Sequence, residues 1–193
     1  MKEKIQAELA RSAAVITALH ESPEVVAAIE SIAEHCANAL RYGAKILIAG
    51  NGGSAADAQH LAGELVGRFA FDRPGLAAIA LTVDSSVVTA VGNDYGYEHV
   101  FSRQVEAIGR AGDVFIGLST SGNSANIVTA FASARRQRMT CIGLTGESGG
   151  RMVEWCDVCL KVPARETWNI QEAHMVAGHI ICLLIEATLF GAA

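Results

Sequence analysis

The chain has 193 residues, of which 51% are hydrophobic and 18% charged, and its formal net charge is −5. The length fits one domain, and the acidic balance, with no basic run beyond Arg135-Arg136, argues against a nucleic-acid partner held through its phosphates. We also expect no membrane partner and a cytoplasmic location, because no apolar run reaches the roughly 18–20 residues that span a bilayer and residues 1–18 lack the layout of a signal peptide.

Two helices are predicted at the start of the chain, over residues 3–19 and 23–42. Apolar residues recur there at helical spacing, Pro23 suits a first helical turn, and Gly43 suits the end of the second helix. These helices form a predicted N-terminal extension, residues 1–43, ahead of a core over residues 44–193.

The core alternates apolar strands with helical stretches, which indicates a parallel sheet covered on both faces. Strands are predicted over residues 46–49, 77–81, 114–118, 140–144 and 158–162, and helices over 54–69, 85–91, 100–108, 124–138 and 167–190. We predict an α/β fold in a single domain, residues 1–193, with a doubly wound five-stranded parallel sheet in the flavodoxin-like order 2-1-3-4-5. The last helix is so apolar that we expect a neighbour, such as another subunit, to bury it.

Two short loops of glycine and hydroxyl residues follow the first and third predicted strands. One runs from Gly50 to Ala56 and the other from Ser119 to Ser124, and each precedes a predicted helix. Glycine lets the backbone approach a ligand, and the N–H groups and dipole of a helix N-terminus favour an anion. Strands 1 and 3 are neighbours in the predicted order, so both loops are expected in one crevice, holding a phosphorylated ligand from two sides.

A candidate metal site lies on the helices after these loops. His60 and Glu64 are four residues apart, which puts an imidazole and a carboxylate on one helix face. Gln171 and His179 are two turns apart on the last helix, and together the four side chains make a donor set suited to zinc or a similar ion. His174 is a weaker candidate, because it points away from His179.

Three other motifs leave alternatives open. Residues 50–55 nearly match the dinucleotide fingerprint, but no acid follows at the expected interval. Cys156 and Cys159 form an isolated C-x-x-C, read either as small buried apolar residues or as a redox or zinc pair. Residues 92–96 are predicted as a turn in which Asn93 and Asp94 either serve the turn itself or contact sugar hydroxyls.

These motifs resemble the sugar-isomerase (SIS) domain family, and within it the phosphoheptose isomerases. The resemblance covers nearly the whole chain and rests on residues 50–60 with Glu64, 71–74, 92–96, 119–124, and 170–172 with His174 and His179. It implies a homotetramer whose active sites lie at subunit interfaces.

The resemblance also implies site residues. One Zn²⁺ per subunit is expected at His60, Glu64, Gln171 and His179. Substrate contacts are expected from Asn51, Gly52, Gly53, Glu64, Asn93, Asp94, Ser119, Thr120, Ser121, Ser124 and Gln171.

The implied reaction is the aldose–ketose isomerisation of sedoheptulose 7-phosphate to D-glycero-D-manno-heptose 7-phosphate through an enediol(ate), which would supply heptose for a bacterial envelope lipopolysaccharide. We expect Glu64 to act as the base and His179 as the acid, beside a divalent metal. The alternative is a non-catalytic SIS scaffold that binds the bacterial replication initiator. A sugar-phosphate-sensing domain of a transcriptional regulator is less favoured, because the first two helices lack a basic face.

Overall fold

The structure is a computed structural model that describes residues 1–191. Its centre is a five-stranded sheet in the order β2-β1-β3-β4-β5, with every pair of neighbours parallel. The strands are β1 (Ile46–Ala49), β2 (Ala78–Ala80), β3 (Val114–Leu118), β4 (Thr140–Gly146) and β5 (Val158–Val162). The predicted fold class and strand order are confirmed.

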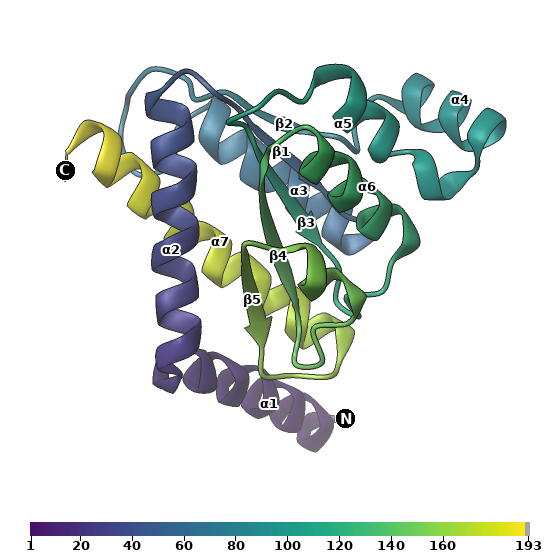
Figure 1. Cartoon of the computed structure of the whole chain (residues 1–193). Coiled ribbons are helices and arrows are strands. Elements are labelled where there is room, and N and C mark those ends of the chain that lie inside the picture. The colour runs from purple at the N-terminus through teal and green to yellow at the C-terminus, as the bar shows by residue number, and fades with distance from the viewer. Residues whose placement is uncertain (192–193) are drawn as a thin grey trace.

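Helices precede, cover and follow the sheet (Figure 1). They are α1 (Lys2–Glu21), α2 (Pro23–Arg41), α3 (Gly53–Val66), α4 (Ser85–Tyr95), α5 (Ser102–Ile108), α6 (Ala125–Arg136) and α7 (Thr167–Phe190), with short 3₁₀ turns η1 (Tyr97–His99) and η2 (Arg151–Trp155). The two N-terminal helices form as predicted. Ser22 caps α2 by accepting the Val25 N–H at 3.3 Å, directly before Pro23 at the first helical position.

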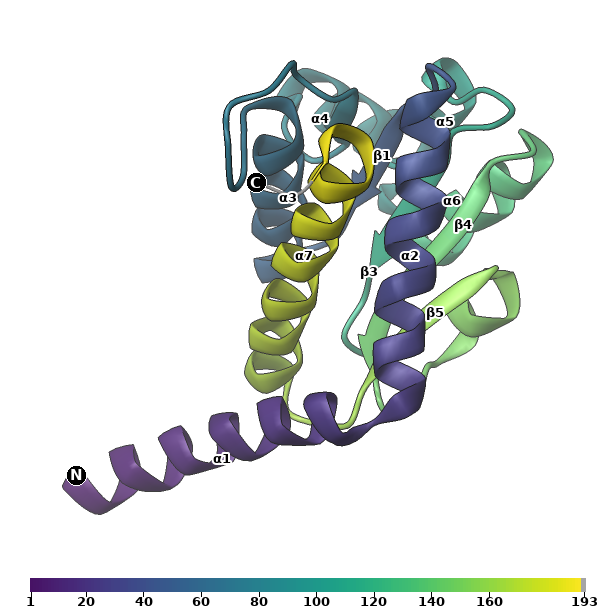
Figure 2. The same ribbon diagram turned by 90° about the vertical axis from the view of Figure 1, so that its left-hand side faces the viewer.

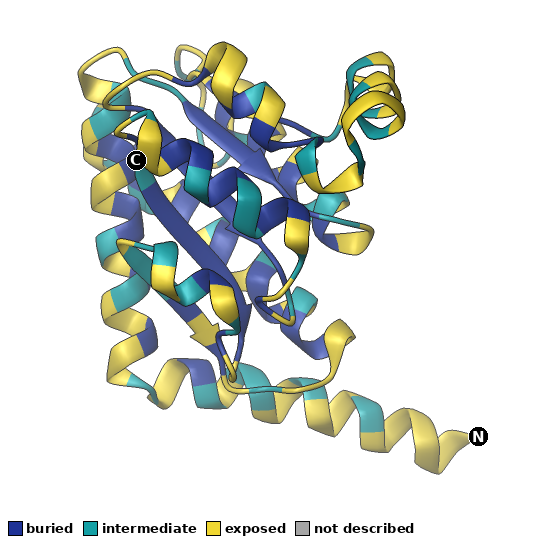
Figure 3. Ribbon diagram, turned by 45° about the vertical axis from the view of Figure 1, so that its right-hand side comes forward, coloured by how far each residue is buried: buried dark blue, intermediate teal, exposed yellow. Residues whose placement is uncertain are grey.

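The central strands β1, β3 and β4 are buried on both faces along nearly their whole length, as continuously apolar strands require, whereas the edge strands are exposed at Ile79 of β2 and Lys161 of β5. In β1, Ile46 and Ile48 pack into a core shared with α2, α3 and α7, whereas Leu47 and Ala49 pack into a second core shared with α5, α6 and η2. Figure 2 shows α2 and α7 side by side over the first face, with α1 projecting beyond it. The burial map in Figure 3 leaves most of α1 exposed.

Several predicted boundaries shift by one or two residues, and two differ by more, for identifiable reasons. Residues 92–95 are not a turn, because α4, which is capped by Asp84, continues to Tyr95. The helix ends only at Gly96, where φ is +94°, a backbone conformation that glycine adopts readily. Helix α3 ends at Val66 instead of residue 69. The Arg73 guanidinium donates to the carbonyls of Glu64 and Leu65 at the end of this helix. These carbonyls therefore have hydrogen-bond partners although the helix does not continue.

Helix α7 is long and apolar enough to cross a membrane by length and composition alone, whereas we expected no such segment from the apolar runs. In its most apolar window, 44% of the residues are buried inside the protein. The helix packs against α2, α3 and the sheet, which is the position of a core helix.

Candidate active site

The two predicted anion loops meet at the carboxyl ends of β1 and β3, which are paired neighbours. They enclose an open hollow of about 310 Å³, which Thr167 and Gln171 of α7 also line. The residues of the loops and of β3 that line it are Asn51, Gly52, Gly53, Ser54, Leu118, Ser119, Thr120 and Ser124. The predicted convergence of the loops in one crevice is therefore confirmed.

The first loop brings its backbone close to the hollow by means of glycine. Gly52, with a φ of +57°, is the N-cap of α3. At Gly53, a Cβ atom would lie only 2.6 Å from Gln171 Nε2, so the absence of a side chain allows the Gln171 amide to rest on the loop. The amide also donates to Ser54 Oγ at 3.4 Å. A ligand at the N-terminus of α3 thus meets both backbone and an amide side chain.

The second loop presents hydroxyl groups at the start of α6. Ser119 Oγ and Ser124 Oγ are 2.9 Å apart and share a hydrogen bond. Ser121 Oγ accepts the backbone N–H of Asn123 at 3.2 Å, and Gly122, with a φ of +67°, turns the chain between them. These hydroxyls are ready donors for phosphate oxygens because their protons can rotate toward a ligand.

An amide pair fixes the first loop to α6. Asn51 Nδ2 donates to Asn126 Oδ1 at 2.9 Å, and Asn126 Nδ2 donates back to Asn51 Oδ1 at 2.8 Å. The Tyr97 hydroxyl donates to the same Asn51 oxygen at 3.2 Å. Neither Asn126 nor Tyr97 was predicted from the sequence, since residues so far apart along the chain carry no local pattern that pairs them.

Farther along α3 and α7, three side chains form a cluster. Potential ligand atoms of His60, Glu64 and His179 all lie within 4.8 Å of one another. His60 Nε2 is 3.0 Å from Glu64 Oε1 and also 3.0 Å from His179 Nε2. Among the described residues this is the one group of at least three histidine, cysteine or acidic side chains close enough to hold a metal ion. Two imidazoles and a carboxylate are a typical catalytic zinc donor set, so these residues fit such an ion.

The segment that follows α3 packs against the cluster and is itself fixed by hydrogen bonds to α7. The Phe69 ring stacks on the His179 ring, with centroids 5.5 Å apart and planes 29° apart. The segment is tied down by Glu186, whose fully buried carboxylate accepts the N–H groups of Phe69 and Ala70 and the Nε–H of Arg73, each at 2.8 Å. Burial raises the pKa of Glu186, but these hydrogen bonds outweigh it and lower the pKa overall.

Comparison with known proteins identifies the family of this chain. A family model described as SIS domain matches residues 10–146. A phosphoheptose isomerase from Burkholderia pseudomallei is 55% identical over 95% of this chain and 93% of its own, and one from Aneurinibacillus thermoaerophilus is 53% identical over 98% and 96%. The solved phosphoheptose isomerase from Neisseria gonorrhoeae superposes with a TM-score of 0.91 at 44% identity, covering 96% of this chain and 98% of that one.

The chain belongs to the phosphoheptose isomerase family of SIS-domain proteins. The site residues predicted from the family resemblance lie mainly in two regions of the structure, the hollow and the cluster. The hollow and the cluster hold most of them, and Ser121 lies on the second loop without lining the hollow. Gln171, predicted as a fourth metal ligand, rests on the first loop. Asn93 and Asp94 pair with each other near the end of α4, also outside the lining of the hollow, so their contact with substrate stays a prediction.

Two further ionisable residues on the helices of the site have pKa values shifted by burial. His174 is fully buried on α7, with Nε2 3.3 Å from the Thr145 carbonyl, and burial lowers its pKa to about 4. It is not one of the side chains of the cluster, which agrees with the prediction that His174 is a weaker candidate ligand than His179. Asp57 lies one turn before His60 on α3, and burial raises its pKa to about 6 while His60 opposes the rise.

Proposed function

We propose that this chain interconverts sedoheptulose 7-phosphate and D-glycero-D-manno-heptose 7-phosphate, with Glu64 as the base and His179 as the acid. As a member of the phosphoheptose isomerase family the chain is an aldose–ketose isomerase. The observation that carries the residue roles is the convergence of His60, Glu64 and His179 within 4.8 Å. The reaction would supply heptose for a bacterial envelope lipopolysaccharide.

The phosphate is proposed to bind in the hollow between the two loops. Hydroxyls of Ser119, Thr120 and Ser124 and the N-terminal backbone of α3 surround it, which suits a phosphate even though the chain is acidic overall. Gln171 lines the hollow and lies two helical turns before His179 of the cluster on the same helix, α7. A seven-carbon sugar phosphate anchored in the hollow would therefore place its reacting carbons near the cluster.

The isomerisation moves a proton between C1 and C2 of the sugar. Glu64 is proposed to take this proton as a carboxylate, and His179 to give and receive the proton of the substrate oxygen. The stacked Phe69 ring limits how far the His179 imidazole can rotate, which keeps it aimed at one position. The phosphate contacts orient the sugar so that one face of the reacting carbons meets Glu64.

Zn²⁺ is the proposed cofactor, one per subunit, held by His60, Glu64 and His179 with Gln171 as a fourth ligand after its amide turns away from the first loop. When bound, such an ion would supply Lewis-acid stabilisation of the negative charge that develops on the substrate oxygens. Glu64 offers two carboxylate oxygens, and Oε1 is the one directed at His60. The other oxygen is therefore the proposed proton acceptor.

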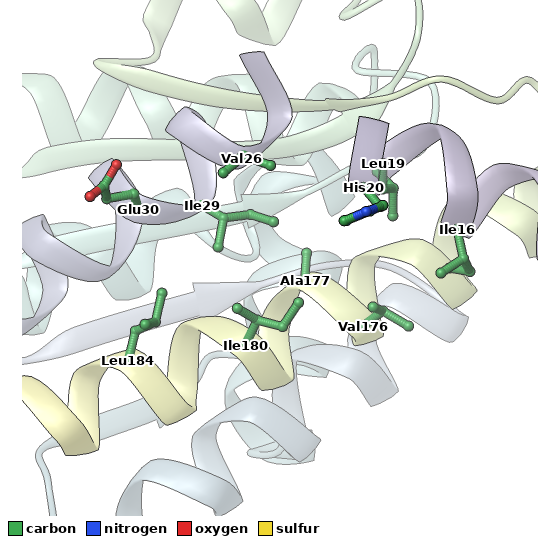
Figure 4. Close-up of a pocket in the computed structure, with 10 residues that line it drawn as sticks. All are labelled: Ile16, Leu19, His20, Val26, Ile29, Glu30, Val176, Ala177, Ile180 and Leu184. Carbon is green, nitrogen blue, oxygen red and sulfur yellow. The ribbon is translucent and has the colours of Figure 1, made fainter. Parts of the chain in front are cut away.

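A cytoplasmic homotetramer with active sites at subunit interfaces is also proposed. Its support is an apolar groove of about 460 Å³ between α1, α2 and α7 (Figure 4). Val26, Val176 and Ile180, which line this groove, are 51%, 37% and 40% exposed in the single chain. Full burial of an exposed side chain of this size is worth roughly 1.5–3 kcal/mol, so burying the remaining half of each against a second copy is worth about half of that.

The test is conversion of sedoheptulose 7-phosphate by zinc-loaded protein, followed by proton NMR. The Glu64→Gln variant should lose turnover while still binding the sugar phosphate, because the loops are intact. Glu172→Gln is the matched control, since Glu172 is an exposed α7 residue outside the cluster, and it should keep wild-type turnover. No turnover by folded, zinc-supplied wild type would overturn the proposal and favour the scaffold that binds the replication initiator.

A further inference from the structure

The Cys156–Cys159 pair lies outside the active site and has no part in the chemistry proposed for it. Cys156 directly follows η2, and Cys159 is in β5. Both are only partly buried, whereas Cys36, Cys141 and Cys182 are buried. The alternative in which the pair is simply buried apolar surface therefore fits these two cysteines less well than the other three.

The two sulfur atoms converge on one point of β4. Gly143 is the register partner of Cys159, and a Cβ atom at Gly143 would lie 2.6 Å from Cys156 Sγ and 3.2 Å from Cys159 Sγ. Both thiols thus share the space that this glycine leaves free. A hydrogen bond from Cys156 to the deprotonated Cys159 sulfur lowers the pKa of Cys159, and the nearby Lys161 adds to the lowering, while the same hydrogen bond and burial raise the pKa of Cys156. The Cys156 thiol has a single proton, so it donates to the Met152 carbonyl when Cys159 is protonated.

The pair is connected to the second anion loop by a short chain of hydrogen bonds. The Cys156 thiol donates to the Met152 carbonyl at 3.2 Å, and the Met152 N–H donates to the Gly122 carbonyl at 2.9 Å. Next to it, the Arg151 N–H donates to Asn123 Oδ1 at 3.0 Å. Turn η2 therefore supports the loop that lines the hollow, and Cys156 in turn supports η2.

We propose that Cys156 and Cys159 are a redox-sensitive thiol pair whose oxidation to a disulfide weakens the support of the second anion loop. The oxidant is a low-molecular-weight disulfide. The Cys159 thiolate attacks one of its sulfurs and forms a mixed disulfide, releasing one small thiol. Cys156 then loses its proton and attacks Cys159 Sγ, which closes the Cys156–Cys159 bond and releases a second small thiol. The protein loses two protons and two electrons, the small disulfide gains both, and the Cys156 S–H donor to Met152 is lost.

The first test treats the native, full-length protein with oxidised glutathione and maps its cysteines by mass spectrometry. Wild type should form the Cys156–Cys159 disulfide without a stable adduct, and dithiothreitol should reverse it. Cys156→Ser should instead hold one glutathione on Cys159, because nothing resolves the mixed disulfide. Reduced cysteines, or a separate stable adduct on each, would overturn the thiol pair. This readout needs no turnover, so its failure is distinct from failure of the isomerase proposal.

The second test measures KM for the sugar phosphate and uses a matched pair of variants. Cys156→Ser keeps a hydroxyl donor for the Met152 carbonyl and should keep the reduced wild-type KM, whereas Cys156→Ala removes the donor and should raise KM. Loss of one neutral hydrogen bond corresponds to roughly a two- to tenfold change. Oxidised wild type should behave like the alanine variant. An unchanged KM in oxidised wild type with a mapped disulfide would overturn the connection to the loop.

Discussion

The buried carboxylate of Glu186 offers the sharpest test of how the site is held. Its side chain has no exposed surface, and that of its partner Arg73 is 2% exposed. In Glu186→Gln, one carboxylate oxygen becomes an NH₂ group that faces an N–H donor, and the Arg73 guanidinium loses its counter-charge. Removing one partner of a buried ion pair costs about 3–5 kcal/mol, a large part of the roughly 5–15 kcal/mol that stabilises a typical domain.

The assay is urea unfolding of the wild type and the Glu186→Gln variant at pH 7 and equal protein concentration. Glu34→Gln, a change of the same chemistry at an exposed position of α2, is the control and should stay within about 0.5 kcal/mol of wild type. Turnover by Glu186→Gln should also fall at temperatures where it is folded, because the segment that carries Phe69 is loosened beneath His179. A loss of less than about 1 kcal/mol would refute the reasoning.

Three further predictions concern the same region. His174 has a pKa of about 4 in the folded protein against an ordinary value of 6.5, so the unfolded chain binds more protons between these two values. The free energy of unfolding should therefore fall by up to about 3 kcal/mol as the pH drops from 6.5 to 4. In urea unfolding, the His174→Gln variant should lose most of this pH dependence, and equal pH dependence in both proteins would contradict the pKa of His174. Gly53→Ala should displace the Gln171 amide and lower turnover at least tenfold, while the free energy of unfolding falls by less than about 1 kcal/mol. The control is Gly63→Ala, which should keep full turnover because a Cβ atom there meets nothing within 4 Å. His60→Ala should weaken zinc binding, measured by competition with a chelator, by more than the roughly 10–100-fold that loss of an outer partner costs; unchanged affinity would remove His60 from the metal site.

The parts of the fold that the sequence predicted well are those set by local pattern. Strands β1, β3 and β5 and helix α7 begin and end at the predicted residues, because segments rich in apolar residues and bounded by glycine, proline or polar residues leave little freedom. The loop crevice and the proximity of His60 to Glu64 followed from topology and helical spacing. The approach of His179 to this pair was expected from the donor chemistry and is confirmed.

What the sequence could not predict depends on contacts between distant segments. Arg73 and Glu186 are 113 residues apart, and only the folded chain shows that they end α3 and hold Phe69. The Asn51–Asn126 amide pair is of the same kind. The turn predicted over residues 92–96 failed because glycine and asparagine are also common at a helix C-terminus, which is where α4 places them.

The most direct test of the central claim, that Glu64 moves the proton between the reacting carbons, is solvent deuterium exchange. Zinc-loaded protein would be incubated with sedoheptulose 7-phosphate in D₂O, and incorporation at C1 of the ketose and C2 of the aldose followed by proton NMR. Wild type should incorporate deuterium, and Glu64→Gln should do so roughly 10²–10⁴ times more slowly, the range expected for loss of a general base. Exchange by Glu64→Gln at the wild-type rate would contradict the account.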